Sequence, residues 1–82
     1  MFYKVKNVIA LDNMLLQVEF ENGVKKTYDT KPLKERWLAF KDLENKALFN
    51  LVRVDAGGYA ITWNSQTDLA CNELWDNGKP VQ

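Results

Sequence analysis

The stretch Met14-Leu-Leu-Gln-Val-Glu-Phe-Glu-Asn-Gly-Val-Lys-Lys-Thr-Tyr-Asp29 decides the fold of this chain. Apolar and polar residues alternate on both sides of Asn22-Gly23. This dipeptide favours a two-residue type I′ turn, because both turn positions then need a positive φ. Leu16, Val18 and Phe20 are expected to point into the core. The stretch therefore predicts the central hairpin of a small antiparallel sheet, and it indicates no chemistry.

The register of this hairpin is open. A two-residue turn places Glu19 opposite Lys26, a favourable charge pair on the solvent-facing side. The same register leaves Val24 and Tyr28 on that side. Either that face is partly covered, or an extra loop residue shifts the second strand, because a shift of one residue moves every side chain to the opposite face.

Strand and turn signals precede the hairpin. Tyr3–Leu11 alternates at first, and the alternation slips at Asn7, which predicts a strand with a β-bulge. Asp12-Asn13 is a turn signal that joins this strand to the hairpin. After the hairpin, Pro32 suits the first turn of a helix, because its missing N–H costs no hydrogen bond there.

The expected helix carries Leu33, Trp37 and Phe40 at positions i, i+4 and i+7. This spacing places the three side chains in one apolar stripe, which we expect to face the core. Asp42 is a candidate N-cap for a second short helix over Leu43–Asn50.

The second half predicts two more strands and a last helix. Leu51–Asp55 and Tyr59–Trp63 are expected to pair antiparallel, because turn glycines separate them. Asn64–Thr67 is a polar loop. A short helix is expected within Asp68–Asp76 and ended by Gly78.

The resulting order β-β-β-α-α-β-β-α has no βαβ alternation. It predicts an α+β fold with a small, mostly antiparallel sheet and helices packed on one face. Eighty-two residues with 46% hydrophobic content suffice for a single domain over residues 1–82.

The chain contains no histidine and one cysteine. The first absence removes the commonest general base and the commonest zinc ligand, and a single cysteine forms neither a thiolate metal site nor an internal disulfide. Cys71 fits a buried filler of the last helix better than a nucleophile, which would need a carboxylate or lysine as its base. We therefore expect no enzyme activity, no metal and no cofactor.

Eleven basic and eleven acidic residues cancel, but their distribution is uneven. Residues 1–41 hold eight basic and five acidic residues and residues 42–82 hold three and six, so the two halves carry +3 and −3. This asymmetry suits self-association or a charged partner, and it is more often solvated surface. Nucleic-acid binding is not expected, because acidic residues interrupt the nearest basic candidate, Lys25–Arg36.

No segment approaches the ~20 apolar residues of a membrane span, and the N-terminus has no apolar run of signal-peptide length. With one cysteine, the simplest expectation is a soluble protein of the cytoplasm that does not bind membranes.

Three tryptophans in 82 residues are a high content. Tryptophan is enriched at binding hot spots, because it buries a large area and carries one N–H donor. Core packing is favoured for Trp63, and for Trp75 core and binding are evenly weighted. Together with Asn64 and Asp68, these are the candidate residues for binding a protein partner. Asp68 is alternatively the cap of the last helix.

Short motifs occur in a fixed order along nearly the whole chain: Phe20-Glu21-Asn22-Gly23, Tyr28-Asp29, Pro32-Leu33, Leu43 with Phe49, Val52-Arg53-Val54-Asp55, Gly57-Gly58, Ile61 with Trp63, and Asp68-Leu69 with Leu74. Their order and spacing resemble the small bacterial family known as domain of unknown function 2442. Ser65-Gln66 stands where that family usually has an asparagine-glycine turn, and Cys71 where a proline is common. Both departures concern the start of the last helix rather than the fold.

The resemblance implies a compact α+β domain without an established activity. Some members resemble an N-terminal module joined to a helix-turn-helix domain, and others look like one gene of a two-gene pair similar to a toxin–antitoxin system. Because the chain ends soon after Pro80, we expect no DNA-reading module here. The resemblance therefore implies action through a protein partner.

Two functions from different classes remain. The first is a protein-interaction or regulatory module, such as the antitoxin-like half of a pair, which binds a small protein or a second copy. The alternative is a small-ligand-binding domain that uses Asp68, Asn64 and Arg53 near the second hairpin, and this requires that Asp68 does not cap a helix.

Overall fold

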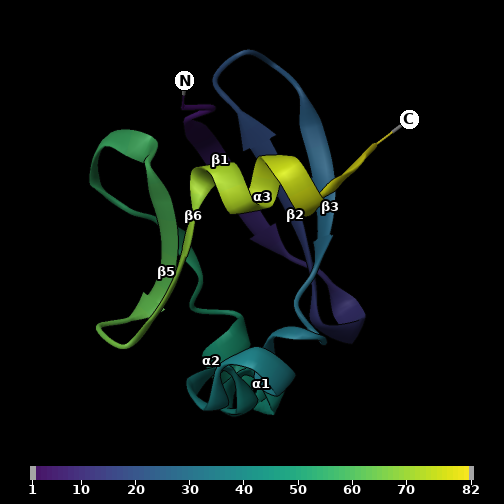
Figure 1. The fold of residues 1–82 in the computed structure, drawn as a ribbon, viewed down its shortest axis with the longest axis vertical. Coiled ribbons are helices and arrows are strands. Elements are labelled where there is room, and N and C mark those ends of the chain that lie inside the picture. Colours follow the sequence, from purple (N-terminus) through teal and green to yellow (C-terminus); the bar gives the residue numbers. More distant parts are fainter. Residues whose placement is uncertain (1, 82) are drawn as a thin grey trace.

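A computed structural model describes residues 2–81 of the chain, and Figure 1 shows its ribbon. Four strands form the first sheet, called sheet A, in the antiparallel order β1-β2-β3-β7. They are β1 (Val5–Ala10), β2 (Leu15–Phe20), β3 (Lys25–Asp29) and β7 (Lys79–Pro80). The predicted central hairpin, β2 and β3, therefore lies in the middle of this sheet.

The central hairpin has a register one residue away from that of a two-residue turn. Leu16 lies opposite Tyr28, and both are buried. Within the turn, Gly23 alone has a positive φ, at 90°. A three-residue loop of this kind is a type I turn followed by a residue in the left-handed region. The extra loop residue, one of the two open alternatives, is confirmed; the type I′ turn and the direct pairing of Glu19 with Lys26 are wrong.

The irregularities predicted around the first strand are confirmed. The pairing of β1 with β2 shifts between Val5 and Asn7, which is the expected bulge. The Asp12-Asn13 turn is a 3₁₀ turn, η1 (Asp12–Met14), in which Asn13 has a φ of 67°. Asparagine tolerates this left-handed conformation better than most residues.

The first expected helix is broken into two short pieces. α1 (Leu33–Arg36) ends where Trp37 adopts an extended backbone, with φ −137° and ψ 117°, and the 3₁₀ helix η2 (Leu38–Glu44) follows. Phe40 is buried as predicted, whereas Trp37 is 44% exposed. The core position predicted for Trp37 is wrong, because the break removes the i, i+4, i+7 geometry.

The second expected helix begins later than predicted. α2 (Lys46–Phe49) follows Asn45, whose side-chain oxygen accepts hydrogen bonds from the N–H groups of Ala47 and Leu48 at 2.9 and 3.3 Å. The prediction of Asp42 as the cap is wrong. Asn45 occupies that position, and asparagine is as good an N-cap as aspartate.

A second sheet, called sheet B, contains β4 (Arg53–Val54), β5 (Ala60–Asn64) and β6 (Thr67–Ala70) in the antiparallel order β4-β5-β6. The predicted pairing of the strands around the diglycine turn is confirmed, and that turn is η3 (Ala56–Gly58). The sequence pattern does not predict β6, because Asn64–Thr67 is typical of a polar loop and Asp68 of the start of a helix. Asp68 instead lies in a strand and caps no helix.

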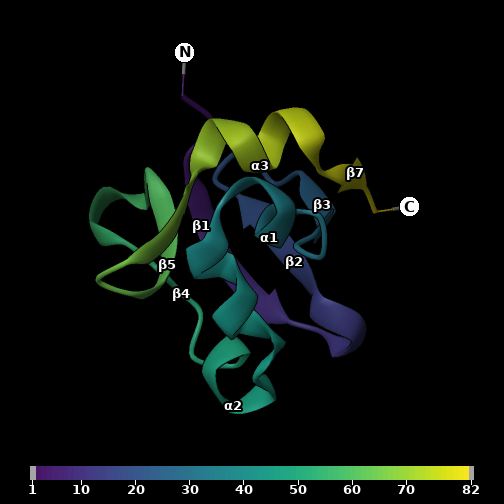
Figure 2. The ribbon, with the colours of Figure 1, turned by 60° about the horizontal axis from the view of Figure 1, so that its bottom comes forward.

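The last helix, α3 (Cys71–Asn77), starts directly after β6 and ends at Gly78, whose N–H donates to the Leu74 carbonyl at 2.9 Å. The end at Gly78 and the buried position of Cys71 are confirmed. α3 crosses one face of sheet A, and α1, η2 and α2 gather at one end of the molecule (Figures 1 and 2).

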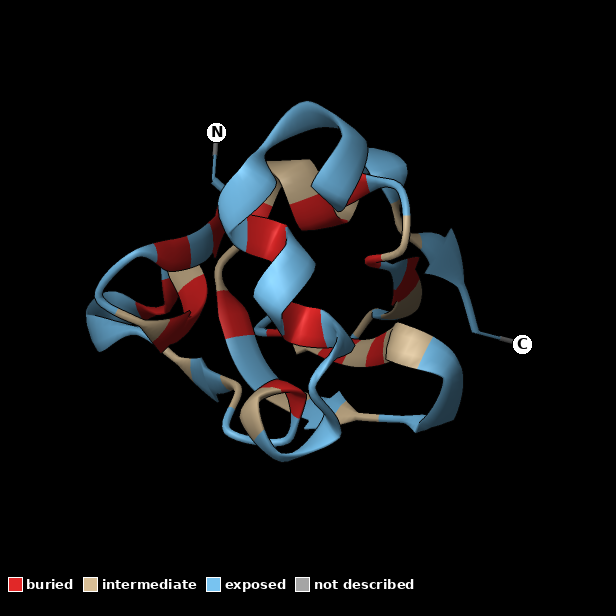
Figure 3. Ribbon diagram, turned by 90° about the horizontal axis from the view of Figure 1, so that it is seen from below, coloured by how far each residue is buried: buried red, intermediate tan, exposed pale blue. Residues whose placement is uncertain are grey.

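Both sheets and the helical segments contribute to one hydrophobic core. Figure 3 shows buried positions on strands of both sheets and on the helices. The buried side chains are Val5, Leu16, Val18, Phe20, Tyr28, Leu33, Phe40, Leu43, Phe49, Ile61, Trp63, Leu69, Cys71 and Leu74. The α+β class with antiparallel sheets and packed helices is confirmed, although the strands are divided between two sheets.

Candidate functional site

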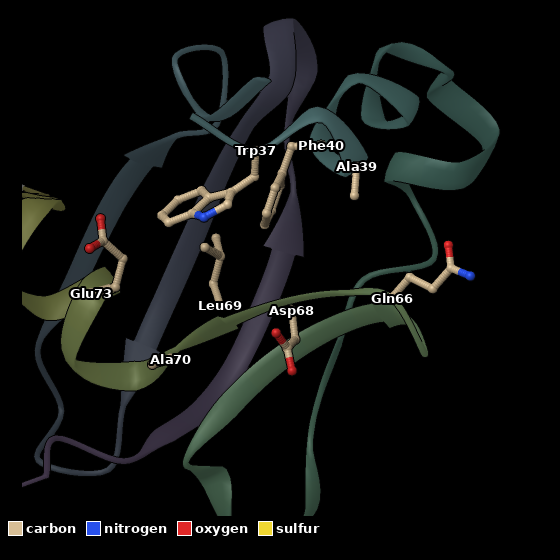
Figure 4. Close-up of a pocket in the computed structure, with 8 residues that line it drawn as sticks. All are labelled: Trp37, Ala39, Phe40, Gln66, Asp68, Leu69, Ala70 and Glu73. Carbon is tan, nitrogen blue, oxygen red and sulfur yellow. The ribbon is translucent and has the colours of Figure 1, made fainter. Parts of the chain in front are cut away.

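A cleft of about 420 Å³ opens between the start of η2 and the β6–α3 segment (Figure 4). Segments far apart in the sequence form its two walls, so it depends on the complete fold. Its lining consists of Trp37, Ala39, Phe40, Gln66, Asp68, Leu69, Ala70 and Glu73.

The apolar wall of the cleft is made by Trp37, Phe40 and Leu69. The rings of Trp37 and Phe40 are 5.8 Å apart between centroids and tilted by 48°, and Figure 4 shows Leu69 pointing toward them. Phe40 and Leu69 are buried, whereas Trp37 remains 44% exposed. The extended backbone of Trp37 turns this side chain out of the helical stripe and presents its ring at the mouth of the cleft.

A second exposed apolar side chain follows Trp37 directly in the sequence. The side chain of the next residue, Leu38, is 81% exposed, the largest exposed fraction among the large apolar residues described. The guanidinium of Arg36 lies over the indole ring of Trp37 at 4.4 Å from its centroid. Exposed tryptophan and leucine side chains cost hydration free energy, which burial against a partner would recover.

Two acidic residues, Asp68 and Glu73, line the cleft. The Asp68 side chain points to the side of β6 away from Trp37 and Phe40 (Figure 4). Asp68 is exposed on β6, and no ion pair within residues 2–81 includes it. Glu73 accepts hydrogen bonds from the Tyr28 hydroxyl at 2.8 Å and from the Asn77 amide at 2.7 Å. Burial and the Glu73 carboxylate raise the pKa of Tyr28 well above its ordinary value, so this hydroxyl stays protonated and donates at neutral pH.

The structure separates the four predicted partner-binding residues. Trp63 is 2% exposed, and its indole N–H donates to the Phe49 carbonyl at 3.1 Å, so it is a core residue as favoured. The Asn64 side chain accepts from the N–H of Gln66 at 2.9 Å and shapes the turn between β5 and β6. Of the four, Asp68 alone lines the cleft.

Trp75 lies half-buried in an aromatic cluster away from the cleft lining. Its ring stacks on Tyr3, with centroids 3.9 Å apart, and meets Phe20 edge-on at 5.0 Å. The Lys26 ammonium lies 3.9 Å from the centre of the indole and donates to the Trp75 carbonyl at 2.6 Å. These contacts join the N-terminal segment and β3 to α3, which is a structural role.

The residues of the alternative ligand-binding arrangement lie on three strands of sheet B: Arg53 on β4, Asn64 at the end of β5 and Asp68 on β6. Arg53 and Asp68 each lie opposite Thr62, on its two sides, so the central strand of sheet B separates them. An Arg53 nitrogen is 3.5 Å from the Trp63 carbonyl. The requirement that Asp68 does not cap a helix is met, and of the three residues only Asp68 lines the cleft.

The basic residues of Lys25–Arg36 are largely engaged within the chain. Lys31 forms an ion pair with Asp29 at 3.1 Å, and Lys34 forms one with Glu44 at 2.8 Å. Lys26 is held against α3. These contacts leave no continuous basic stripe along that segment.

Sequence reasoning missed Trp37 and Leu38 as surface residues. One signal was present: Trp37-Leu38-Ala39-Phe40 is a run of four apolar residues. A helix of 3.6 residues per turn cannot direct four consecutive side chains to one face, so part of the run had to face solvent.

The described residues form a small α+β domain with two antiparallel sheets and an open cleft that has an apolar wall. The chain belongs to the family described as "Protein of unknown function (DUF2442)", whose pattern matches residues 5–80. No curated protein matches the chain. No solved structure matches it either. Among residues 2–81, none of the helices has the length and apolar character needed to cross a membrane.

Proposed function

We propose that this domain is a protein-interaction module whose binding surface is the cleft beside Trp37 together with the exposed side chain of Leu38. The observation that supports this function is the 44% exposure of Trp37 at the mouth of an apolar cleft. Tryptophan side chains at such positions often contribute most of the binding free energy of an interface, because water is excluded around a large apolar ring.

The chemistry of the chain supports binding rather than catalysis. It has no histidine, and Cys71 is buried. Of the two acidic residues that line the cleft, Glu73 already accepts hydrogen bonds from a tyrosine and an asparagine, and the Asp68 side chain points away from Trp37. We therefore propose a non-enzymatic role in the cytoplasm of a bacterium, and the family resemblance supports a regulatory or antitoxin-like role beside the product of a neighbouring gene.

This function is tested by affinity capture with matched variants. The tagged protein retains partners from a nuclease-treated lysate of its own cells, and mass spectrometry identifies them. We expect one stoichiometric small protein, lost with Trp37→Ala and Leu38→Ser. Leu51→Ser is the control, because Leu51 is 60% exposed but does not line the cleft. Equal capture by all four proteins, or capture by none, would refute the interaction function.

A small-ligand function is the second candidate, because the cleft volume of about 420 Å³ lies within the usual range for ligand pockets. A thermal-shift screen against a metabolite collection distinguishes the two. A ligand site predicts a compound that raises Tm for the wild type and not for Trp37→Ala. An interaction module predicts no such compound.

A further inference from the structure

β6 is an edge strand, because sheet B ends with it in the order β4-β5-β6. Two backbone hydrogen bonds show which residues of β6 face β5. The N–H of Cys71, the residue after β6, donates to the Tyr59 carbonyl at 2.8 Å, so Tyr59 faces β6. The carbonyl of the next residue, Ala60, instead accepts from the N–H of Asp55 at 2.8 Å, so Ala60 faces away from β6. Backbone groups of successive strand residues point to opposite sides. Position 71 therefore faces β5, and position 70 does not.

The same alternation continues along β6. Leu69 lies opposite Ile61 and faces β5 with its N–H and carbonyl. The backbone N–H and carbonyl of Asp68 and the backbone N–H of Ala70 point away from β5, to the free edge of the sheet. No backbone hydrogen bond within residues 2–81 joins these groups to another segment. They are donors and acceptors at the spacing that an added strand requires.

The cleft runs beside this free edge. Figure 4 shows the side chains of Leu69 and Asp68 on opposite sides of β6, with Leu69 directed toward Trp37 and Phe40. Side chains of an added strand would alternate in the same way. Every second residue would enter the apolar cleft against Trp37, and the residues between would lie on the side of Asp68.

Charge selects the kind of strand that fits. Asp68 and Glu73 are the charged residues that line the cleft, which has no lysine or arginine in its lining. The Asp68 carboxylate lies on the side of β6 away from Trp37. A basic side chain beside Asp68 is favourable, because opposite charges on neighbouring strands attract. A second copy of β6 would bring its own Asp68 to the same place, and like charges in directly opposed positions destabilise pairing.

We propose that this domain binds an extended peptide segment, in which apolar and basic residues alternate, as a fourth strand on the free edge of β6. This proposal rests on the interaction function and defines the partner's chemistry: a basic, strand-forming segment of another protein. The backbone of Asp68 and Ala70 supplies hydrogen bonds, the cleft at Trp37 takes the apolar side chains, and Asp68 takes a basic one.

A library of random twelve-residue peptides displayed on phage serves as the probe. We expect selected sequences with lysine or arginine at every second position and apolar residues between them. A synthetic copy of one is then methylated at single backbone nitrogens. Methylation of the alternate amides that face β6 should weaken binding at least about tenfold, and methylation of the intervening amides should leave it within about twofold, because an N-methyl group removes one donor and blocks strand pairing.

Variants of the protein test the same geometry. Asp68→Asn should weaken the basic peptide several-fold, and Asp68→Pro should weaken it further, because proline removes the outward N–H as well as the charge. Asp76→Asn is the control for a lost carboxylate in α3, since Asp76 does not line the cleft. Circular dichroism confirms that each variant is folded; if Asp68→Pro is not, the methylated peptides and Asp68→Asn decide.

Selected peptides with no basic preference, with apolar residues at helical spacing, or with no dependence on the parity of methylation would overturn strand addition. Failure to select any peptide would also overturn it. If strand addition is overturned in any of these ways, the interaction function stands as long as Trp37→Ala still abolishes capture of the cellular partner. If that capture is independent of Trp37, the interaction function itself is refuted.

Discussion

At the scale of single residues, the three tryptophans have three different roles. Trp63 is enclosed in the core between Phe40 and Phe49, with both ring centroids at 6.1 Å. Trp75 is half-buried in the Tyr3 stack, and Trp37 is presented to solvent. A high tryptophan content therefore has no single meaning here, because burial assigns each side chain to packing or to binding.

Trp63→Ala should lower the free energy of unfolding by about 3–5 kcal/mol, because it leaves a large cavity in the core. Trp37→Ala should lower it clearly less, since Trp37 is already 44% exposed and its loss uncovers less buried apolar area. Urea unfolding followed by circular dichroism measures both. Similar losses for the two variants would contradict the burial of one and the exposure of the other.

Tyr28 predicts a specific loss of stability at alkaline pH. Its pKa is raised in the folded state by burial and by Glu73, so the folded protein holds the phenolic proton more tightly than the unfolded chain. The stabilisation is fully present below the unfolded pKa of about 10 and is lost as pH rises above it. Tyr28→Phe should remove this component.

The measurement compares urea unfolding of the wild type and Tyr28→Phe at about pH 8 and about pH 11. Both proteins lose stability through their other groups, and the wild type should lose more. The same alkaline loss in both would show that the Tyr28 hydroxyl does not ionise on unfolding in this range.

At the scale of elements, sequence reasoning found the hairpin but not its register. Asn22-Gly23 suits a two-residue turn and also a three-residue loop that places only Gly23 at positive φ. What decides between them is the burial of Tyr28, whose hydroxyl reaches Glu73 on α3. That contact spans 45 residues, so no local pattern contains it.

β6 and the cleft were beyond sequence reasoning for a related reason. Thr67–Ala70 is four residues long and does alternate, with Thr67 and Leu69 buried. Asp68 nevertheless suggested a helix cap, because aspartate before a helical segment is a common N-cap. The chain enters the helix three residues later. The cleft depends on this strand and on the break at Trp37, and neither was predicted.

The diglycine turn of sheet B gives a prediction about how the two sheets pack. A Cβ at Gly58 would lie 2.7 Å from the Val5 carbonyl of β1, whereas a Cβ at Gly23 meets nothing within 4 Å. Both glycines have a positive φ, at 79° and 90°. Gly23→Ala should cost about 1–2 kcal/mol for the left-handed backbone alone. Gly58→Ala should cost clearly more.

Thermal unfolding of the two glycine variants measures this difference. Because the backbone strain is similar, the excess at Gly58 reports the close approach of η3 to β1. Equal losses would mean that the turn moves away from β1 without cost, and that the two sheets pack loosely at this point.

Lys26 joins β3 to the C-terminal end of α3. Its ammonium donates to the Trp75 carbonyl and lies over the indole ring. A cation at a helix C-terminus also interacts favourably with the helix dipole. Lys26→Met, which keeps the length of the side chain, should cost about 1–2 kcal/mol. Lys25→Met is the matched control, because Lys25 is the residue next to Lys26 and its side chain is exposed. Equal losses of stability in urea unfolding would contradict the role of Lys26.

At the scale of the whole molecule, the two sheets have separate hydrogen-bond networks but share one core. Val18 of sheet A and Ile61 of sheet B are both fully buried in it. Phe49 of α2 connects to sheet B through its carbonyl and the Trp63 indole. The cleft keeps its shape only if neither of its walls unfolds separately from the other. Cooperative folding of the shared core is therefore a condition for specific binding.

Native-state hydrogen exchange tests this cooperativity. Trp63→Phe removes the hydrogen bond to the Phe49 carbonyl and should lower the free energy of unfolding by about 1–2 kcal/mol. If the domain unfolds as one unit, the amides of Val18 and Ile61 exchange through global unfolding and lose the same amount of protection. If only the amide of Ile61 exchanges faster, sheet B opens separately from sheet A. The cleft at β6 would then be lost by local unfolding of sheet B while sheet A stays folded. A strand added to the edge of β6 would in that case stabilise sheet B alone.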